Sequence, residues 1–231
     1  MNPYTYDYNQ IDGFGEHDFA GFYEAMVDLA PRGAVIVETG CFHGRSLVQL
    51  GLYAQAKAKG IQVIGIDHCI DQSAGCEDHL LGHLDKSGLS YDALDSIPAV
   101  RFIKEDCVKA AQLFNDNSVW MVFLDDDHSH EAVAAEIDAW MPKIDKHGYL
   151  CGHDCRWHSV WEPVYAKLKD VIHDPKWDNV WYTRKQIPLQ NDLVDIRKSV
   201  RIEGEFGPFG YGYGDKRNDG GPSGVIKSWA S

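Results

Sequence analysis

Acidic side chains, some with a histidine beside them, follow five short apolar runs of the sequence. These residues are Glu38, Asp67, Asp106, the run Asp125-Asp126-Asp127-His128, and the pair His153-Asp154. A carboxylate can accept hydrogen bonds from hydroxyl groups, bind a cation or take up a proton, and an imidazole can do the last two. The sequence therefore carries side chains for cation binding and proton transfer at five comparable places.

A glycine turn follows the first of these runs. The apolar residues 34–37 lead through Glu38 to Gly40 and Gly44, and Ser46 stands at the start of a helix-like segment. Glycine permits a tight turn and a close approach of the backbone to a ligand, and the first amides of a helix attract anionic groups. The spacing is Gly-x-x-x-Gly and not the Gly-x-Gly-x-x-Gly of dinucleotide-binding proteins. We therefore expect a nucleotide-like ligand that is not a dinucleotide.

The apolar runs alternate with segments of helical spacing, which predicts an α/β fold with a Rossmann-like, doubly wound, mostly parallel sheet of about seven strands. We expect strands at 34–38, 62–67, 100–106, 119–124, 149–152, 180–183 and 192–203. We expect helices at 18–29, 47–58, 76–87, 107–114, 133–141 and 158–172. Ligands bind outside the carboxyl ends of the strands in such a sheet, so the acids that end the strands are expected to share one cleft.

The chain length of 231 residues suits one α/β domain with short extensions. We expect an N-terminal arm and helix over 1–30, the α/β domain over 31–203, and a tail rich in glycine and aromatic residues over 204–231. The segment 68–83 contains three histidines and two cysteines, but their spacing matches no standard zinc pattern. We expect a polar loop beside the ligand there.

The composition limits the partners and the compartment. The net charge is −13, from 35 acidic and 22 basic residues, and nucleic-acid binding needs a basic surface. No stretch of about 18 apolar residues and no secretory signal occurs in the sequence. The six cysteines form no Cys-x-x-Cys pair, which is typical of reduced thiols. We expect a cytoplasmic protein without a nucleic-acid or membrane partner, and a homo-oligomer is compatible with the sequence.

The acids after the first three runs suit an adenosine-like ligand. A carboxylate in the place of Asp67 can accept both ribose hydroxyls, and Asp106 can reach an adenine amino group. Glu38, beside the glycine turn, favours a ligand with positive charge. Capping of a following helix is the alternative role for Asp67 and Asp106.

The acids after the fourth and fifth runs suit a metal ion. Three consecutive carboxylates repel one another unless solvent or a cation compensates their charge. A position at the start of a helix explains one of them, but not three followed by His128. With Asp154, they provide oxygen ligands for Mg²⁺ or a similar divalent cation.

Four segments together resemble the class I S-adenosylmethionine-dependent methyltransferases, in particular a small-molecule O-methyltransferase branch. They are Val-Glu-Thr-Gly-Cys-Phe-His-Gly-Arg-Ser (37–46), Gly-Ile-Asp (65–67), Phe-Leu-Asp-Asp-Asp-His-Ser-His (123–130) and Gly-Tyr-Leu-Cys-Gly-His-Asp (148–154). The resemblance covers residues 30–185. It implies a seven-stranded sheet with one antiparallel edge strand.

The resemblance also implies residue roles. The cofactor contacts it implies are Glu38, Gly40, Gly44, Ser46, Asp67 for the ribose, Asp106 for the adenine, and Asp125. Asp125 and Asp154 are the implied metal ligands, and His153 is the candidate third ligand because Cys155 stands where relatives often have Asn or Asp. Asp127, His128 and His153 are the candidates for accepting the proton of the acceptor.

The expected function is methyl transfer from S-adenosylmethionine to a hydroxyl of a small molecule such as a sugar or a glycosylated metabolite, with assistance from a divalent cation. Two alternatives stay open. One is a protein that keeps the cofactor site without the chemistry, and the other is a different metal-dependent enzyme on the same scaffold.

Overall fold

The computed structural model describes residues 6–13, 19–69, 76–89, 100–168, 170–173, 177 and 179–185. The strand expected at 192–203 and the tail 204–231 lie outside these residues. The domain boundaries expected at residues 30 and 203 stay predictions.

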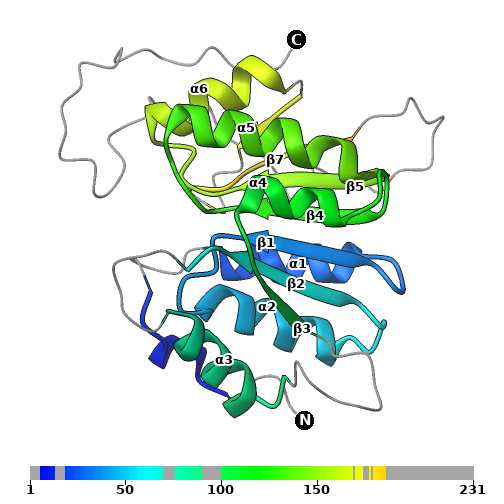
Figure 1. The fold of residues 1–231 in the computed structure, drawn as a ribbon. Helices are drawn as coiled ribbons and strands as arrows, with labels where there is room; N and C mark the ends of the chain where they lie inside the picture. The colour runs from blue at the N-terminus through cyan, green and yellow to red at the C-terminus, as the bar shows by residue number, and fades with distance from the viewer. Residues whose placement is uncertain are drawn as a thin grey trace.

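Strands and helices alternate along the described chain, and their arrangement can be followed in Figure 1. The strands are β1 (Val35–Thr39), β2 (Gln62–Asp67), β3 (Val100–Lys104), β4 (Val119–Leu124), β5 (Ile144–Gly152), β6 (Ile172–His173) and β7 (Trp181–Arg184). The α-helices are α1 (Ala20–Leu29), α2 (Arg45–Ala56), α3 (Cys76–Lys86), α4 (Cys107–Ala110), α5 (His130–Trp140) and α6 (His158–Lys167). Short 3₁₀ turns are η2 (Tyr8–Gln10), η3 (Ala111–Leu113) and η4 (Met141–Lys143). None of the described helices is both long and apolar enough to cross a bilayer.

The seven strands form one sheet in the order β3-β2-β1-β4-β5-β7-β6. The pairs from β3 to β5 are parallel, and β7 is antiparallel to both β5 and the short outer strand β6. The predicted mostly parallel, doubly wound sheet with an antiparallel strand at one side is confirmed. The chain order reverses between β1 and β4, which is the place where open sheets of this type bind ligands.

The central strands are apolar on both faces because helices cover both sides of the sheet. On β4, Met121 and Phe123 join the core that contains α1 and α2 residues such as Phe22 and Leu50. Val122 and Leu124 join the second core, with residues of α5 and α6. This pattern explains why the strands read as continuous hydrophobic runs and why they were the easiest elements to predict.

The structure differs from the sequence expectation at β5, at α6, and at the short strand β6, which begins at Ile172 where the end of a helix was expected. Strand β5 begins at Ile144 and not at Tyr149, and its pairing with β4 shifts between Val119 and Met121. Gly148 lies against the backbone of Trp120 so closely that a Cβ atom could not fit. The polar residues 145–147 lie in this irregular stretch of β5, so its apolar pattern begins late. Helix α6 ends at Lys167, earlier than the predicted residue 172.

Candidate active site

The carboxyl ends of β1, β2 and β4 meet at one edge of the sheet, and backbone contacts fasten them together. The amide of Gly40 donates to the carbonyl of Ile66 at 2.9 Å, and the amide of Asp125 donates to the carbonyl of Thr39 at 3.1 Å. Gly40 has a φ of +75°, and a Cβ atom there would lie 2.6 Å from Cα of Asp126 and closer still to the carbonyl of Asp125. Only glycine fits between the two loops.

The glycine turn leads directly into α2. Gly44 precedes the helix with a φ of 86°, in the left-handed region, and its amide donates to the carbonyl of Cys41 at 2.8 Å. No side chain caps the start of α2. Such a helix start can present its amides to an anionic group of a ligand.

Glu38 is fully buried at the end of β1, and Ser46 Oγ of α2 donates to its Oε1. Burial raises the pKa of Glu38 to about 8, although the hydrogen bond from Ser46 opposes the shift. The buried hydroxyl of Tyr23 also faces the Glu38 carboxyl, and this contact likewise opposes the rise in the pKa of Glu38. A cationic ligand beside Glu38 would stabilise its ionised form.

Asp67, at the end of β2, is buried, and two backbone amides bind its carboxylate. Phe42 N donates to Oδ2 at 2.8 Å, and Cys69 N donates to Oδ1 at 2.7 Å. Each carboxylate oxygen has a second lone pair and can accept a further hydrogen bond. Asp67 therefore joins the β1 and β2 loops and still has acceptor capacity for a ribose hydroxyl.

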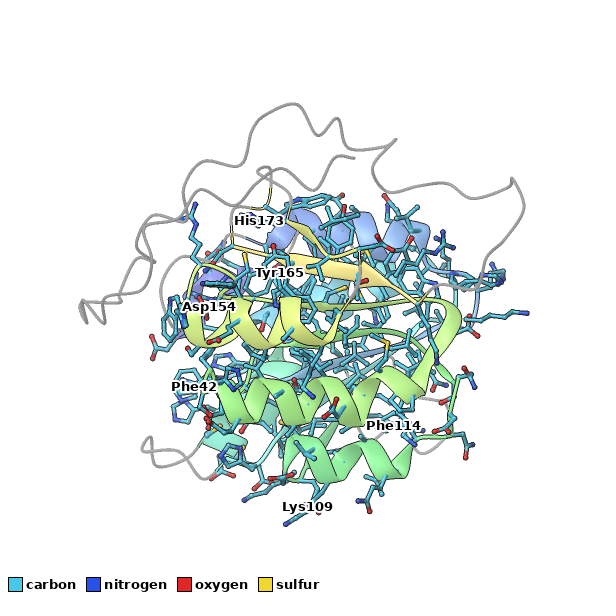
Figure 2. The ribbon with its side chains drawn as sticks, turned by 90° about the horizontal axis from the view of Figure 1, so that it is seen from above. Phe42, Lys109, Phe114, Asp154, Tyr165 and His173 are labelled. Carbon is cyan, nitrogen blue, oxygen red and sulfur yellow. The ribbon has the colours of Figure 1, made fainter. Side chains whose placement is uncertain are left out.

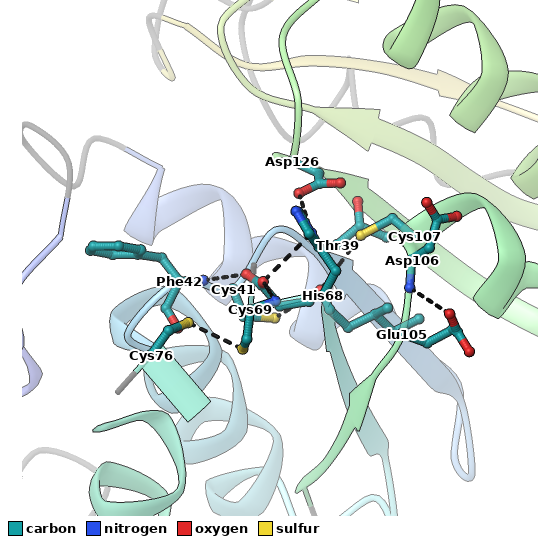
Figure 3. A network of polar contacts seen from close by, with 12 residues as sticks. Thr39, Cys41, Phe42, His68, Cys69, Cys76, Glu105, Asp106, Cys107 and Asp126 are labelled. Carbon is teal, nitrogen blue, oxygen red and sulfur yellow. Dashed lines mark hydrogen bonds and ion pairs between the residues drawn. The ribbon is translucent and has the colours of Figure 1, made fainter. Parts of the chain in front are cut away.

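Asp106 caps α4, as the alternative interpretation held, because its Oδ1 accepts a hydrogen bond from Lys109 N at 2.9 Å. Its side chain is exposed. Nearby in Figure 3, His68 lies between two strand ends, with Nδ1 3.7 Å from Asp126 Oδ1 and 3.9 Å from Asp67 Oδ1. The region beyond β2 and β3 is therefore acidic, with one histidine among the acids.

Asp125, His128, His153 and Asp154 form a compact cluster beyond β4 and β5. His128 Nε2 lies 2.7 Å from Asp154 Oδ2 and 3.5 Å from Asp125 Oδ1. His153 Nδ1 lies 3.4 Å and 3.6 Å from the same two oxygens. The side chains are 14–28% exposed, so solvent reaches them only in part.

In this cluster, the two carboxylates of Asp125 and Asp154 share the protonated imidazole of His128. Burial opposes the charged form of His128, but its contacts with Asp125 and Asp154 prevail and raise its pKa to about 10. Burial also opposes ionisation of Asp154, but hydrogen bonds from His128 and His153 hold its pKa well below the usual range. Around neutral pH, His128 is therefore a proton donor in this arrangement.

Asn179, just before β7, holds the loop that carries Asp154. Its Nδ2 donates to Asp154 Oδ1 at 2.8 Å, its Oδ1 accepts from Arg156 N at 3.2 Å, and its carbonyl accepts from Cys155 N at 3.3 Å. Asp154 has a φ of 52°, which is uncommon for residues other than glycine. Asn179 therefore helps to fix a carboxylate in an unusual backbone conformation, with one oxygen left for the cluster.

One aromatic ring packs against each of the two histidines of the cluster, and Asp127 lies exposed nearby. The ring centroid of Phe19 is 4.9 Å from that of His153, and the centroid of Trp157 is 5.0 Å from that of His128. Asp127 is exposed, and its Oδ1 accepts a hydrogen bond from Ser129 N at 2.8 Å, which forms the turn into α5. Its role as proton acceptor stays a prediction.

The structure brings the predicted residues to one edge of the sheet, as Figure 2 illustrates with Phe42 and Asp154 at the same end of the molecule. His128 adds a candidate ligand to the predicted metal ligands Asp125, Asp154 and His153. Ligand atoms of Asp125, His128 and Asp154 all lie within 4.8 Å of one another. This set of carboxylate oxygen and imidazole nitrogen fits a divalent ion, with imidazole favouring a transition metal over Mg²⁺.

Three residues of the site were not expected from the sequence: Tyr23, Asn179 and Glu136. Glu136 of α5 is buried, its Oε1 has no hydrogen-bond partner among the described residues, and burial raises its pKa to about 8. Tyr23 lies fully buried in α1, within the core. A buried Glu on the apolar face of a helix is the one local signal available for Glu136.

A family model described as a methyltransferase domain matches residues 37–155, just over half of the chain. No curated protein sequence gives a significant match. The matched segment contains the glycine turn, the acids that end β1 to β5, and the histidine cluster. The predicted resemblance is therefore confirmed.

Solved structures share the fold at low sequence identity. The TDP-rhamnose 3'-O-methyltransferase CalS11 of calicheamicin biosynthesis is 18% identical with a TM-score of 0.55, over 71% of this chain and 76% of CalS11. A SAM-dependent O-methyltransferase from Thermotoga maritima is 16% identical with a TM-score of 0.56, over 78% of this chain and 69% of its own. The Podospora anserina methyltransferase PaMTH1, bound to SAH, is 12% identical with a TM-score of 0.55, over 73% and 78%.

Proposed function

The chain belongs to the methyltransferase-domain family, as a S-adenosylmethionine-dependent enzyme, and from this premise we propose that it methylates a hydroxyl oxygen of a small molecule with the help of a divalent cation. The observation that carries the proposal is the cluster of Asp125, His128 and Asp154 beside the glycine turn. A methyl donor held by the turn would face an acceptor held by the cluster.

The cofactor half of the proposal rests on charge. S-adenosylmethionine carries a sulfonium and an ammonium, and Glu38 provides a fully buried carboxyl whose ionised form burial disfavours and a nearby cation would stabilise. Asp67 offers acceptor capacity for the ribose, and Asp106 keeps its second oxygen for the adenine amino group. We propose Gly40, Gly44 and Ser46 as the residues that shape the turn around the methionine part.

The acceptor half rests on the histidine cluster. A bound divalent cation would lower the pKa of an acceptor hydroxyl. Asp125 and Asp154 would hold the ion, and His128 must give up its proton before its imidazole can join them. Asp127, whose side chain is exposed, and His153 are then the candidates for accepting the acceptor's proton.

We propose a sugar or a glycosylated metabolite as the acceptor. CalS11 is described as acting on TDP-rhamnose, which makes sugar nucleotides the first class to test. The aromatic rings of Phe19 and Trp157 beside the cluster suit the apolar face of a sugar ring.

The test is calorimetry with S-adenosylmethionine, followed by turnover on a panel of sugar nucleotides and phenols after EDTA treatment and after addition of Mg²⁺ or Mn²⁺. We expect cofactor binding without metal and turnover only with metal. The variant Asp125→Asn should lose turnover and keep cofactor affinity within a few-fold. Full activity in EDTA would refute the metal role, and binding without turnover on any acceptor would favour the protein without chemistry.

A further inference from the structure

Two thiols lie in contact beside the candidate cofactor site. The sulfur atoms of Cys69 and Cys76 are 3.2 Å apart, and Figure 3 shows them facing each other across the start of α3. Cys69 follows β2 by two residues and is half-buried, whereas Cys76 is the buried first residue of α3. A disulfide has an S–S distance of about 2.05 Å, so the sulfurs need to approach by roughly 1 Å more.

Both cysteines are linked to Asp67: Cys69 binds its carboxylate directly, and Cys76 binds Phe42, which also binds that carboxylate. Cys69 N donates to Asp67 Oδ1, and Phe42 N donates to Asp67 Oδ2. The thiol of Cys76 donates to the carbonyl of Phe42 at 3.1 Å, which leaves the Cys69 thiol to donate to Cys76 Sγ. The four residues form a closed ring of hydrogen bonds, and the thiol hydrogens complete two of its links.

We propose that Cys69 and Cys76 are a site of reversible oxidation by small disulfides such as oxidised glutathione, and that the disulfide weakens binding of the cofactor at Asp67. The second clause rests on the proposed function, and the first does not. Four other cysteines are all buried, so Cys69 is the thiol that an oxidant can reach first.

The reaction has two exchange steps. The thiolate of Cys69 attacks one sulfur of oxidised glutathione, forms a mixed disulfide and releases one glutathione thiolate. The thiolate of Cys76 then attacks the sulfur of Cys69 and releases the second glutathione. The protein loses two electrons and two protons, and the oxidant is reduced to two thiols.

Two local features bear on the rate. Cys76 stands at the first residue of α3, where the helix dipole favours negative charge on its sulfur. Burial raises the pKa of Cys69, so its attack becomes faster as the pH rises.

The sequence allows a direct test of the bond. No Lys or Arg lies between Lys59 and Lys86, so trypsin leaves both cysteines in the peptide 60–86. Oxidation of the full chain with glutathione disulfide should lower the mass of this peptide by two hydrogen atoms. Cleavage before Asp71 should leave the two halves joined until dithiothreitol is added. A peptide that stays reduced, or carries only a glutathione adduct, would overturn the proposal.

The functional clause is tested by calorimetry with S-adenosylhomocysteine on reduced and oxidised protein. We expect the affinity to fall by about twofold to tenfold on oxidation, which is the range of one net hydrogen bond. Dithiothreitol should restore it, Cys76→Ser should abolish the response, and Cys151→Ala should retain it. An oxidised peptide with unchanged affinity would refute the functional clause. Failure of the reduced protein to bind would instead count against the proposed function.

Discussion

Replacing Gly40 by alanine tests the close approach of the glycine turn to the Asp125 loop. Gly40 and Gly33 have nearly equal φ values, +75° and +74°, but nothing lies within 4 Å of a Cβ atom at Gly33. Gly33→Ala should therefore cost only the left-handed backbone penalty of about 1–2 kcal/mol. Gly40→Ala bears the same penalty and also forces the backbone at Asp125 and Asp126 away, which adds about 1–3 kcal/mol of overpacking.

The difference in unfolding free energy between Gly40→Ala and Gly33→Ala isolates the steric cost of a Cβ atom at Gly40. Urea unfolding should show Gly40→Ala to be less stable than Gly33→Ala by about 1–3 kcal/mol. Because the displaced loop carries Asp125, Gly40→Ala should also lose most methyl transfer, while Gly33→Ala keeps it. Equal unfolding free energies for the two variants, with activity retained in both, would refute the argument that β1 and β4 must meet at this glycine.

Three further predictions concern side chains at the same edge of the sheet. Asn179→Ala removes the hydrogen bond that orients Asp154 and should weaken Mn²⁺ binding in calorimetry by about 10–100-fold. The control Asn115→Ala, at an exposed position, should leave Mn²⁺ binding unchanged. A change below twofold in Asn179→Ala would make Asn179 purely structural. Cofactor binding near pH 7 should release a proton from Glu38, whose pKa is about 8, visible as a dependence of the binding enthalpy on the buffer; an equal release in Glu38→Gln would contradict this. Burial raises the pKa of Glu136 in the folded protein to about 8. Its contribution to stability is therefore present below its unfolded pKa and is lost as the pH rises through 8. Glu136→Gln should flatten the resulting fall in melting temperature between pH 6 and pH 9.

The fold was predictable because burial on both faces imposes a simple pattern. Strands β2 and β4 have the predicted bounds, since each is a continuous apolar run that ends in an acid. Strand β5 was predicted too short because its first half is polar and irregular. That irregularity depends on the contact between Gly148 and the Trp120 backbone, which is a tertiary contact without a local signal.

The candidate site was predictable to the extent that it follows from topology. Acids at the ends of parallel strands must share an edge, so Glu38, Asp67 and Asp125 could be placed together without coordinates. Asn179 could not, because it is 25 residues from Asp154 and reaches it only through the pairing of β5 with β7. The choice between His128 and His153 as partner of Asp154 likewise depends on side-chain positions that spacing does not define.

Each carboxylate at this edge of the sheet has a different kind of partner, and this difference indicates where a positively charged ligand can bind. Backbone amides bind Asp67, and the protonated imidazole of His128 lies against Asp125 and Asp154, where a cation can replace its proton. Glu38 accepts a hydrogen bond from Ser46 Oγ, but burial outweighs it and raises the pKa of Glu38 to about 8, so this carboxyl is largely protonated below pH 8. A sulfonium cofactor therefore gains most beside Glu38, where it restores an ionised carboxylate, and a divalent cation gains most at the histidine cluster, where it competes with exchangeable protons. Two positive ligands can thus bind one acidic edge at separate places, which is the arrangement that metal-assisted methyl transfer requires.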